Sequence, residues 1–365
     1  ATCWVGVGGG LVANTTTGRT KYRIHGLTPY SADVYTKKFG SMFVDYLNGA
    51  VGPLFAPPIE FEIGSESFDS VFDSAERQNF DFLFTFSNMV GCLEAEFNAQ
   101  PLLTLRDLRG DHELNRYGGV VFALRDREDI QSLHDLSNHA IAATSILLMQ
   151  HQWRVFSNMG ISMLSEANAL IFVGDESRVL DMLLSGEADV GFTRTDHVEG
   201  FNSSPKYRNM FKILNPKQGL SIDGQDFPFA STSMLYPESA IVSMEHVDYR
   251  VSREVAKALL ALDRYSPHSQ AAGIAGWQLA LSYAPSRDLY MSLGLMLYNP
   301  ERRRHHCVRA TLTNFYPSIK CPLGQYKKSE SDVVSGCPLS GFSCPSGSTC
   351  LCRPCRDGSE IEVSR

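Results

Sequence analysis

The sequence predicts an α/β fold, in which the strands of a parallel sheet alternate with helices. A strand expected over residues 22–27 is followed by one apolar helical face over residues 35–47, and together they make a βα unit. Residues 80–86 alternate phenylalanine with other residues, and Leu83 makes this strand apolar on both faces, as a central parallel strand should be. Residues 176–199 contain a helix, a turn, a strand and a helix start, so the alternation continues in the second half of the chain.

The remaining elements follow from the same periodicities. Further strands are expected over residues 59–63, 140–143, 169–173, 188–192, 211–214, 232–235 and 240–244. Apolar helical stripes are expected over residues 68–75, 179–183 and 255–260. The glycine-rich stretch near the start lacks the last glycine of a GxGxxG motif and precedes no helical pattern, so it predicts an extended arm rather than a dinucleotide site.

The stretch from Ser185 to Gly191 carries a family resemblance. A helix ending in SGxxDxG, followed by a strand and an acidic helix start, resembles the signature of the PhnD-like, phosphonate-binding family of periplasmic solute receptors. Four further stretches look like the version found in sensor ectodomains, namely residues 236–238, 245–248, 276–277 and 283–285. The resemblance covers roughly residues 21–296. It implies a type II periplasmic-binding-protein fold, whose two α/β lobes close on a ligand like a flytrap.

This resemblance also implies a domain organisation. Residues 1–20 are expected to form an N-terminal arm, residues 21–116 and 230–300 lobe 1, residues 117–229 lobe 2, and residues 301–320 a linker. Residues 321–365 are rich in Pro, Gly, Ser and Cys, so they are expected to need disulfides in place of a core. Their opening, from Cys321 to Tyr326, looks like that of the small ephrin-receptor-like cysteine-rich repeats.

Polar residues at strand ends are the candidate ligand-binding residues, because ligands of open α/β sheets bind outside the carboxyl ends of the strands. The candidates are Tyr30, Ser31, Thr85, Ser87, Asn88, Thr144, Ser145, Thr193, Arg194 and Thr195. The polar residues after residue 84 can equally cap the next helix. Arg194 suits a bidentate contact with a carboxylate or phosphonate, and a surface or inter-lobe ion pair is an equal alternative.

One departure from the family concerns the ligand. At residues 143–146 the family usually carries an STSG-like turn, whose hydroxyls and amides grip phosphonate oxygens, but this chain has Ala-Thr-Ser-Ile. The change removes one hydroxyl and places a β-branched residue where glycine allows close approach. A cleft is still expected. Asp175, where the family often has a pocket residue, is better explained as a helix N-cap.

Cysteines and sequons indicate a secreted protein. Cys321, Cys337, Cys344, Cys350, Cys352 and Cys355 crowd into the tail, where they can form disulfides or, less expectedly, a zinc site made by the last four. Outside the tail, Cys92 can pair with Cys3 or with Cys307, and the odd total leaves one thiol over. Asn14 and Asn202 begin acceptor sequons for glycosylation.

Composition excludes several other classes of function. The chain has 365 residues with a formal net charge of -7, which argues against a nucleic-acid partner, and no apolar run approaches the roughly 20 residues of a membrane helix. Motifs such as GxSxG, HExxH and the P-loop are absent, so neither an enzyme, a cofactor nor a metal site is expected. The chain starts at Ala1 without a signal peptide, so a secreted protein would be numbered from after cleavage.

These observations together predict an extracellular or cell-surface sensor of the eukaryotic secretory pathway. A small anionic ligand would bind between the lobes, and closure would be relayed through the cysteine-rich segment to other extracellular chains. The alternative is a structural or adhesion glycoprotein that keeps the fold without a ligand.

Overall fold

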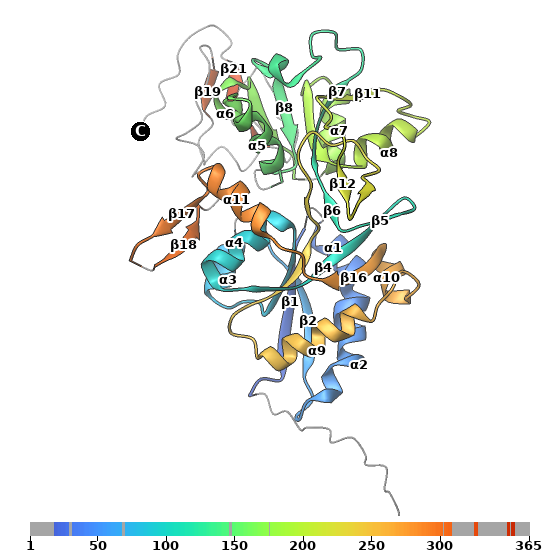
Figure 1. The fold of residues 1–365 in the computed structure, drawn as a ribbon, viewed down its shortest axis with the longest axis vertical. Helices are drawn as coiled ribbons and strands as arrows, with labels where there is room; N and C mark the ends of the chain where they lie inside the picture. The colour runs from blue at the N-terminus through green and yellow to red at the C-terminus, as the bar shows by residue number, and fades with distance from the viewer. Residues whose placement is uncertain are drawn as a thin grey trace, which may run out of the picture.

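The computed structural model describes residues 18–28, 31–67, 70–145, 148–174, 176–301 and 303–308, and the backbone of short strands at 325–327, 349–350 and 352–354. These residues form two α/β lobes, one above the other along the long axis of the molecule, joined by crossing segments (Figure 1). The α/β two-lobed fold expected from the sequence is therefore confirmed.

Lobe 1 is built on a seven-stranded sheet with the order β16-β4-β15-β3-β1-β2, and β5 pairs with β4. Its strands are β1 (Lys21–Leu27), β2 (Glu60–Ser65), β3 (Phe82–Thr85), β4 (Gln100–Arg109), β5 (His112–Leu114), β15 (Ala240–Ser243) and β16 (Ile274–Leu279). The sequence pattern predicts β1, β2, β3 and β15 to within two residues, but it predicts no strand at β4. Polar residues such as Arg106 and Asp107 interrupt the apolar pattern of β4, which becomes central only through its pairing with β15 and β16.

Helices flank this sheet on both sides (Figure 1). They are α1 (Ala32–Gly40), the π-helical η1 (Ser41–Tyr46), α2 (Leu47–Ala50), η2 (Gly52–Leu54), α3 (Val71–Glu76), α4 (Ser87–Phe97), α9 (Tyr249–Leu260), α10 (Pro267–Ala272) and α11 (Ala284–Ser292). The apolar face expected over residues 35–47 is buried, and Phe39 lies 4.8 Å from Phe84 between ring centroids. Trp277 of β16 completes this aromatic core, 5.8 Å from the ring of Phe84.

Lobe 2 is built on a sheet with the order β11-β7-β10-β8-β9-β20. Its strands are β7 (Gly119–Leu124), β8 (Ala140–Ala143), β9 (Ala169–Phe172), β10 (Val190–Arg194), β11 (Phe211–Ile213) and β20 (Thr349–Cys350). Its helices are η3 (Leu133–Leu136), α5 (Gln150–Asn158), α6 (Met163–Glu166), α7 (Glu176–Leu184) and α8 (His197–Ser203), with a hairpin of β12 (Ser221–Ile222) and β13 (Gln225–Asp226). β8 runs parallel to both β9 and β10, so their carboxyl ends meet at one edge, facing lobe 1 (Figure 1).

The connection between the lobes is short. β6 (Arg116–Tyr117) pairs antiparallel with β14 (Tyr236–Pro237). The strand expected over residues 232–235 is wrong, because the N–H groups of Thr232 and Ser233 both donate to the Gly119 carbonyl and side chains make the return bonds, so no regular ladder forms. Thr232 Oγ1 accepts from the Val121 N–H at 3.0 Å, and Ser233 Oγ accepts from the Gly119 N–H at 2.8 Å.

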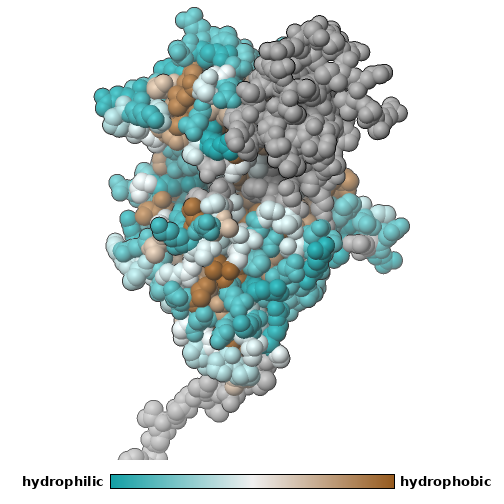
Figure 2. Space-filling view, turned by 180° about the vertical axis from the view of Figure 1, so that it is seen from behind, coloured by the Kyte–Doolittle hydropathy of each residue, from teal (hydrophilic) through white to brown (hydrophobic). Residues whose placement is uncertain are grey.

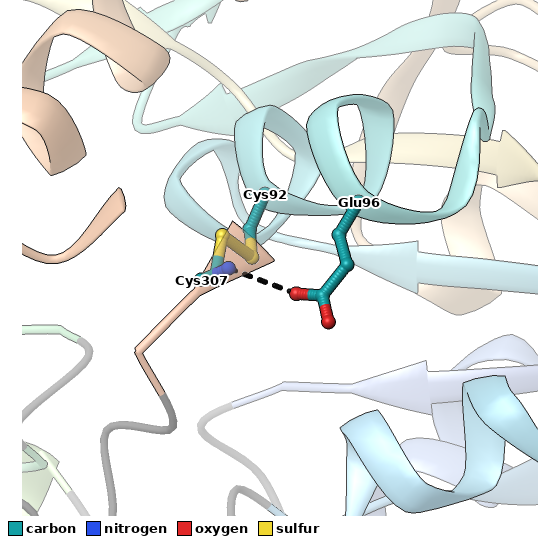
Figure 3. A group of neighbouring side chains, drawn as sticks. All are labelled: Cys92, Glu96 and Cys307. Atoms are coloured by element: carbon teal, nitrogen blue, oxygen red, sulfur yellow. Dashed lines mark hydrogen bonds between the residues drawn. A yellow bond between two sulfur atoms is a disulfide. The ribbon is translucent and has the colours of Figure 1, made fainter. Parts of the chain in front are cut away.

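A disulfide joins Cys92 in α4 to Cys307 (Figure 3). Cys307 ends β18 (Arg304–Cys307), which pairs with β17 (Met296–Asn299), so part of the stretch expected as a linker is a hairpin attached to lobe 1. Glu96, one turn after Cys92, accepts from the Cys307 N–H at 2.9 Å. These three residues lie close enough to hold a metal, but the disulfide already uses both sulfur atoms.

The C-terminal segment is described only in part. β19 (Gln325–Lys327) pairs with β21 (Cys352–Pro354), and β20 adds to the edge of lobe 2 beside β9. Cys3 and the side chains of the six tail cysteines lie outside the described residues, so neither their pairing nor the zinc alternative is tested.

The described surface is mostly hydrophilic, with separate apolar patches on the face shown in Figure 2. Exposed apolar side chains include Tyr249, Tyr265 and Leu279, each on a different element or loop of lobe 1. Among the described residues, no helix has the length and apolar character needed to cross a membrane.

Candidate ligand-binding site

A cavity lies between the lobes at the carboxyl ends of β8 and β10. Its walls come mostly from lobe 2 and the crossing segments, with Phe86 from lobe 1; they comprise Phe86, Tyr117, Gly118, Gly119, Ala143, Thr144, Leu148, Met149, His151, Gln152, Glu176, Phe192, Thr193, Arg194, Glu238 and Ser239. It offers about 60 Å³ to the centres of water-sized groups. At roughly 10–15 Å³ for each water, this space suits a ligand group of only a few atoms.

Of the predicted ligand residues, Thr144, Thr193 and Arg194 line this cavity. Thr193 and Arg194 end β10, where the strand-end argument placed them, and Thr144 directly follows β8. Thr195 lies just behind them, fully buried, and its Oγ1 accepts from Arg109 at 3.1 Å. The structure thus brings together four of the five lobe 2 candidates, all except Ser145.

The lobe 1 candidates lie outside this cavity. Thr85 is fully buried at the end of β3, and Ser87 lies 3.5 Å from the hydroxyl of Tyr117. Asn88 donates to Gln150 at 3.2 Å across the lobes. Ser31 caps α1 by accepting from the Val34 N–H at 3.4 Å, and it is exposed.

The last two candidates are Ser145 and Tyr30. Ser145 accepts from the Leu148 N–H at 3.2 Å, so its hydroxyl serves the turn before α5. Tyr30 lies outside the described residues, as does Asp175, which the sequence analysis assigned to a helix cap.

Arg194 forms an ion pair across the lobes, which is the second of the two roles expected for it from the sequence. Its Nη1 lies 3.3 Å from Asp107 Oδ2 of β4, and its Nε lies 3.8 Å from Asp196 Oδ1. Burial acts to raise the pKa of Asp107, but Arg194 and Arg109 outweigh burial and hold that pKa below its usual value. The guanidinium is therefore already compensated by carboxylates.

His197 has a defined tautomer beside Arg194. Its Nε2 accepts from Arg194 Nε at 3.0 Å, so the proton must be on Nδ1, which lies 2.8 Å from Thr193 Oγ1. Burial, followed by the charge of Arg194, lowers the pKa of His197 to about 3. A neutral imidazole thus holds the Arg194 and Thr193 side chains in place.

A second buried cluster, around Arg109 and Glu238, was missed by sequence reasoning. Arg109 ends β4, its side chain is 1% exposed, and it bonds to Glu238 beside β14. Its Nε also lies 3.1 Å from Asp107 and 3.6 Å from Asp196. The only sequence signal was Glu238 in the Tyr-Pro-Glu match, and nothing in the sequence indicated its partner.

Gly118 and Gly119 allow this close packing at the crossing. A Cβ on Gly119 would lie 2.7 Å from Gln152 Cδ and 2.8 Å from His151 Cβ, distances that real side chains do not tolerate. Glycine at this position therefore lets α5 approach the crossing segment and place His151 and Gln152 in the cavity wall.

His151 and Gln152 are cavity residues that no motif indicated. His151 stacks on Tyr236, with ring centroids 4.1 Å apart, and meets the edge of Tyr117 at 5.1 Å. Burial lowers the pKa of His151 to about 3. The run Gln150-His151-Gln152 places three adjacent polar residues at the start of α5, and only the structure shows that all three are buried.

Asn202, the sequon residue within the described chain, uses its amide inside the fold. Its Nδ2 donates to the Phe211 carbonyl at 3.1 Å, and its Oδ1 accepts from the Phe211 N–H at 3.0 Å. Because glycosylation modifies that nitrogen, the folded state disfavours a glycan at Asn202. Asn14 lies outside the described residues.

Comparison with known proteins identifies relatives of this fold. Residues 26–282 match the family described as "ABC transporter, phosphonate, periplasmic substrate-binding protein", which is more than two thirds of the chain. No curated protein sequence matches the chain significantly.

Solved structures agree with the family match. A Xanthomonas citri protein bound to ATP aligns with a TM-score of 0.56 at 16% identity, over 76% of this chain and 97% of that one. A binding component of a Pseudomonas aeruginosa ABC phosphonate transporter aligns with a TM-score of 0.55 at 9% identity, over 74% and 86%. A Prochlorococcus marinus protein in complex with methylphosphonate aligns with a TM-score of 0.51 at 14% identity, over 75% and 98%. At these identities the likeness concerns the fold alone.

Proposed function

The chain belongs to the phosphonate-binding family of periplasmic substrate-binding proteins, and from this premise we propose that it binds a small solute between its two lobes and closes on it. The observation that carries the proposal is the cavity between the lobes, which polar groups line at the carboxyl ends of β8 and β10. A ligand there would contact both lobes and so favour the closed state through its differential affinity. The family consists of binding proteins, which agrees with a role other than catalysis.

The same proposal places this domain outside the cytoplasm. Its support is the Cys92–Cys307 disulfide, because disulfides persist in oxidising compartments. The role of a sensor in the eukaryotic secretory pathway, with closure relayed through residues 321–365 to other chains, stays a prediction. The residues that this sensor role requires, 321–365, lie mostly outside the described part of the chain.

Thermal unfolding against a panel of phosphonates, phosphate, carboxylates, amines, amides and amino acids tests the binding function. A ligand at a hundred times its dissociation constant should add about 2.7 kcal/mol to the free energy of unfolding. Thr144→Val removes one cavity hydroxyl at nearly constant shape and should reduce the stabilisation. Thr36→Val, on the exposed face of α1, is the matched control and should leave it unchanged.

The alternative, a structural or adhesion glycoprotein with this fold, makes the opposite prediction. Folded protein would then show no stabilisation by any compound of the panel. Stabilisation that is equal in the parent chain and in the Thr144 variant would place the ligand elsewhere and contradict binding in this cavity.

A further inference from the structure

The cavity wall contains a buried hydrogen-bond acceptor whose orientation is determined. Gln152 is 1% exposed, and its Nε2 donates to the backbone oxygens of Val120 at 3.2 Å and Thr193 at 2.7 Å. Backbone oxygens only accept, so the amide nitrogen must face them and Oε1 must point away. Among the described residues, no donor reaches Gln152 Oε1.

The neighbouring residue presents a second buried polar atom. His151 is 2% exposed, and its Nε2 has no hydrogen-bond partner in the described part of the chain. Because burial lowers the pKa of His151 to about 3, the ring is neutral at pH 7 and its Nε2 can either donate or accept. Buried polar atoms are usually satisfied, so two adjacent exceptions in a cavity wall are places where a bound group, from a ligand or a water, would complete the hydrogen bonds.

Among the described residues, the charged groups of the cavity are poorly suited to hold an anion. Both nearby guanidinium groups, of Arg109 and Arg194, already contact carboxylates. The carboxyl groups of Glu176 and Glu238 also line the wall, and an ionised carboxylate only accepts. A phosphonate would place its acceptor oxygens against these groups and against Gln152 Oε1.

Two backbone amides in the described part of the turn before α5 are engaged as well. The Leu148 N–H donates to Ser145 Oγ at 3.2 Å, and the Met149 N–H donates to the Ser145 carbonyl at 3.1 Å. These two amides are therefore not free to grip an oxyanion, although helix N-termini often bind anions.

We propose that the ligand presents a hydrogen-bond donor, such as an amino or amide N–H of a neutral or cationic molecule, to Gln152 Oε1 and His151 Nε2. This inference rests on the solute-binding function proposed above and specifies its ligand class. The small volume of the cavity restricts the recognised group to a few atoms, and the aromatic rings of Phe86 and Tyr117 would pack against the apolar part of the ligand.

The test compares three probes of similar size on the full chain: methylammonium, acetamide and methylphosphonate. Titration followed by NMR suits them, because probes with so few atoms bind weakly. Methylammonium or acetamide should bind, and methylphosphonate should neither bind nor compete.

His151→Phe is the most informative variant. Phenylalanine retains the stacking on Tyr236 but removes Nε2, so the parent chain should bind the donor probe several-fold to tenfold more tightly than the variant. Removing a buried polar atom without a partner should leave thermal stability equal or raise it. His134→Phe, an exposed position in the same lobe, is the matched control and should change neither property.

Gln152→Met tests the acceptor directly, although it also removes two structural hydrogen bonds. If the variant folds, it should lose donor-probe binding at least tenfold.

Three results would overturn the inference. Specific binding of methylphosphonate would reject the donor-bearing ligand while leaving the solute-binding function intact. Donor-probe binding that His151→Phe and Gln152→Met leave unchanged would reject the roles of these residues. Failure of all three probes and of the wider panel would reject the inference together with the binding function.

Discussion

The two ends of strand β3 carry buried polar clusters that differ in how fully their hydrogen bonds are made. Asp81, just before the strand, is fully buried, and its oxygens accept from Arg19 at 2.6 Å, the Arg23 N–H at 2.7 Å and His246 at 2.9 Å. Beyond the other end of the strand lies the cavity, where Gln152 Oε1 has no donor among the described residues. The satisfied cluster ties the start of the described chain and the loop after β15 to the sheet, whereas the unsatisfied one belongs to residues that line the cavity.

This difference separates stability from recognition. A buried charge with all its partners stabilises one conformation, and losing a partner is costly. A buried acceptor without a partner destabilises the protein by itself, and a bound donor from a ligand or a water compensates for it. Substitutions in the first kind of cluster should therefore change the unfolding free energy, and those in the second kind should change affinity.

The largest effect is expected for Arg109→Met. The substitution leaves the Glu238 carboxyl group, 3% exposed, without its guanidinium, so the unfolding free energy should fall by about 3–5 kcal/mol. Urea unfolding measures the change. The control is Arg106→Met on the same strand, whose partner Glu113 is more accessible, and it should reduce stability by about 1 kcal/mol or less. Equal effects of the two substitutions would contradict a buried, satisfied cluster at Arg109.

Asp81→Asn should have the next largest effect. It removes the charge that holds Arg19 and His246, and the expected loss is about 2–3 kcal/mol in urea unfolding. Affinity for a cavity ligand should stay the same, because Asp81 lies at the opposite end of β3. Asp73→Asn, in an exposed pair with Arg77, is the control and should be close to neutral. A change in ligand affinity in the Asp81 variant would contradict the separation of stability from ligand recognition.

The pH dependence of stability tests the burial of His151. Its folded-state pKa of about 3 is below the ordinary value of 6.5, so the unfolded state binds more protons between these values. Stability should therefore fall as the pH falls through this window, by about 1.4 kcal/mol for each pH unit from this group. His151→Phe lacks this contribution. Between pH 6.5 and 5, the parent chain should lose about 1.6 kcal/mol more than the variant in urea unfolding. Parallel pH profiles would show that His151 is not buried as a neutral ring.

Ser31→Ala should have the smallest effect. Ser31 was a candidate ligand residue, but it caps α1, so the loss should be about 0.5 kcal/mol with no change in ligand affinity. Ser31→Asn, which retains a capping side chain, should restore the stability measured by thermal unfolding. If Ser31→Ala loses ligand affinity, whether or not Ser31→Asn restores it, Ser31 contributes to the binding site.

Local pattern predicted much of the fold. Strand β8 is found at residues 140–143 as expected, and the buried face of α7, with Val179 and Leu183, follows the helical spacing of apolar residues. These features depend on neighbours within a few residues, so periodicity is sufficient to find them. Local pattern did not predict strand β4, and it wrongly predicted a strand at residues 232–235. Pairing with distant segments and side-chain hydrogen bonds decided the conformation of both.

The candidate site was also predicted only as far as local pattern allows. Position along the chain was enough to place Thr193 and Arg194 at the end of a strand and in the wall of a cleft. It could not decide whether Arg194 faces a ligand or Asp107, since 87 residues separate the two partners. Nor could it show that Gln152 lacks a donor, which requires knowledge of every atom around it.

The sequence by itself determined the α/β class, the family and the strand ends that border the cavity, because short-range spacing and motif residues carry that information. Only the tertiary structure decided which polar groups pair with each other and which stay available. Hydrogen bonds and ion pairs act over about 3–4 Å between side chains that the fold alone brings together, so the chemical preference of the cavity follows from packing.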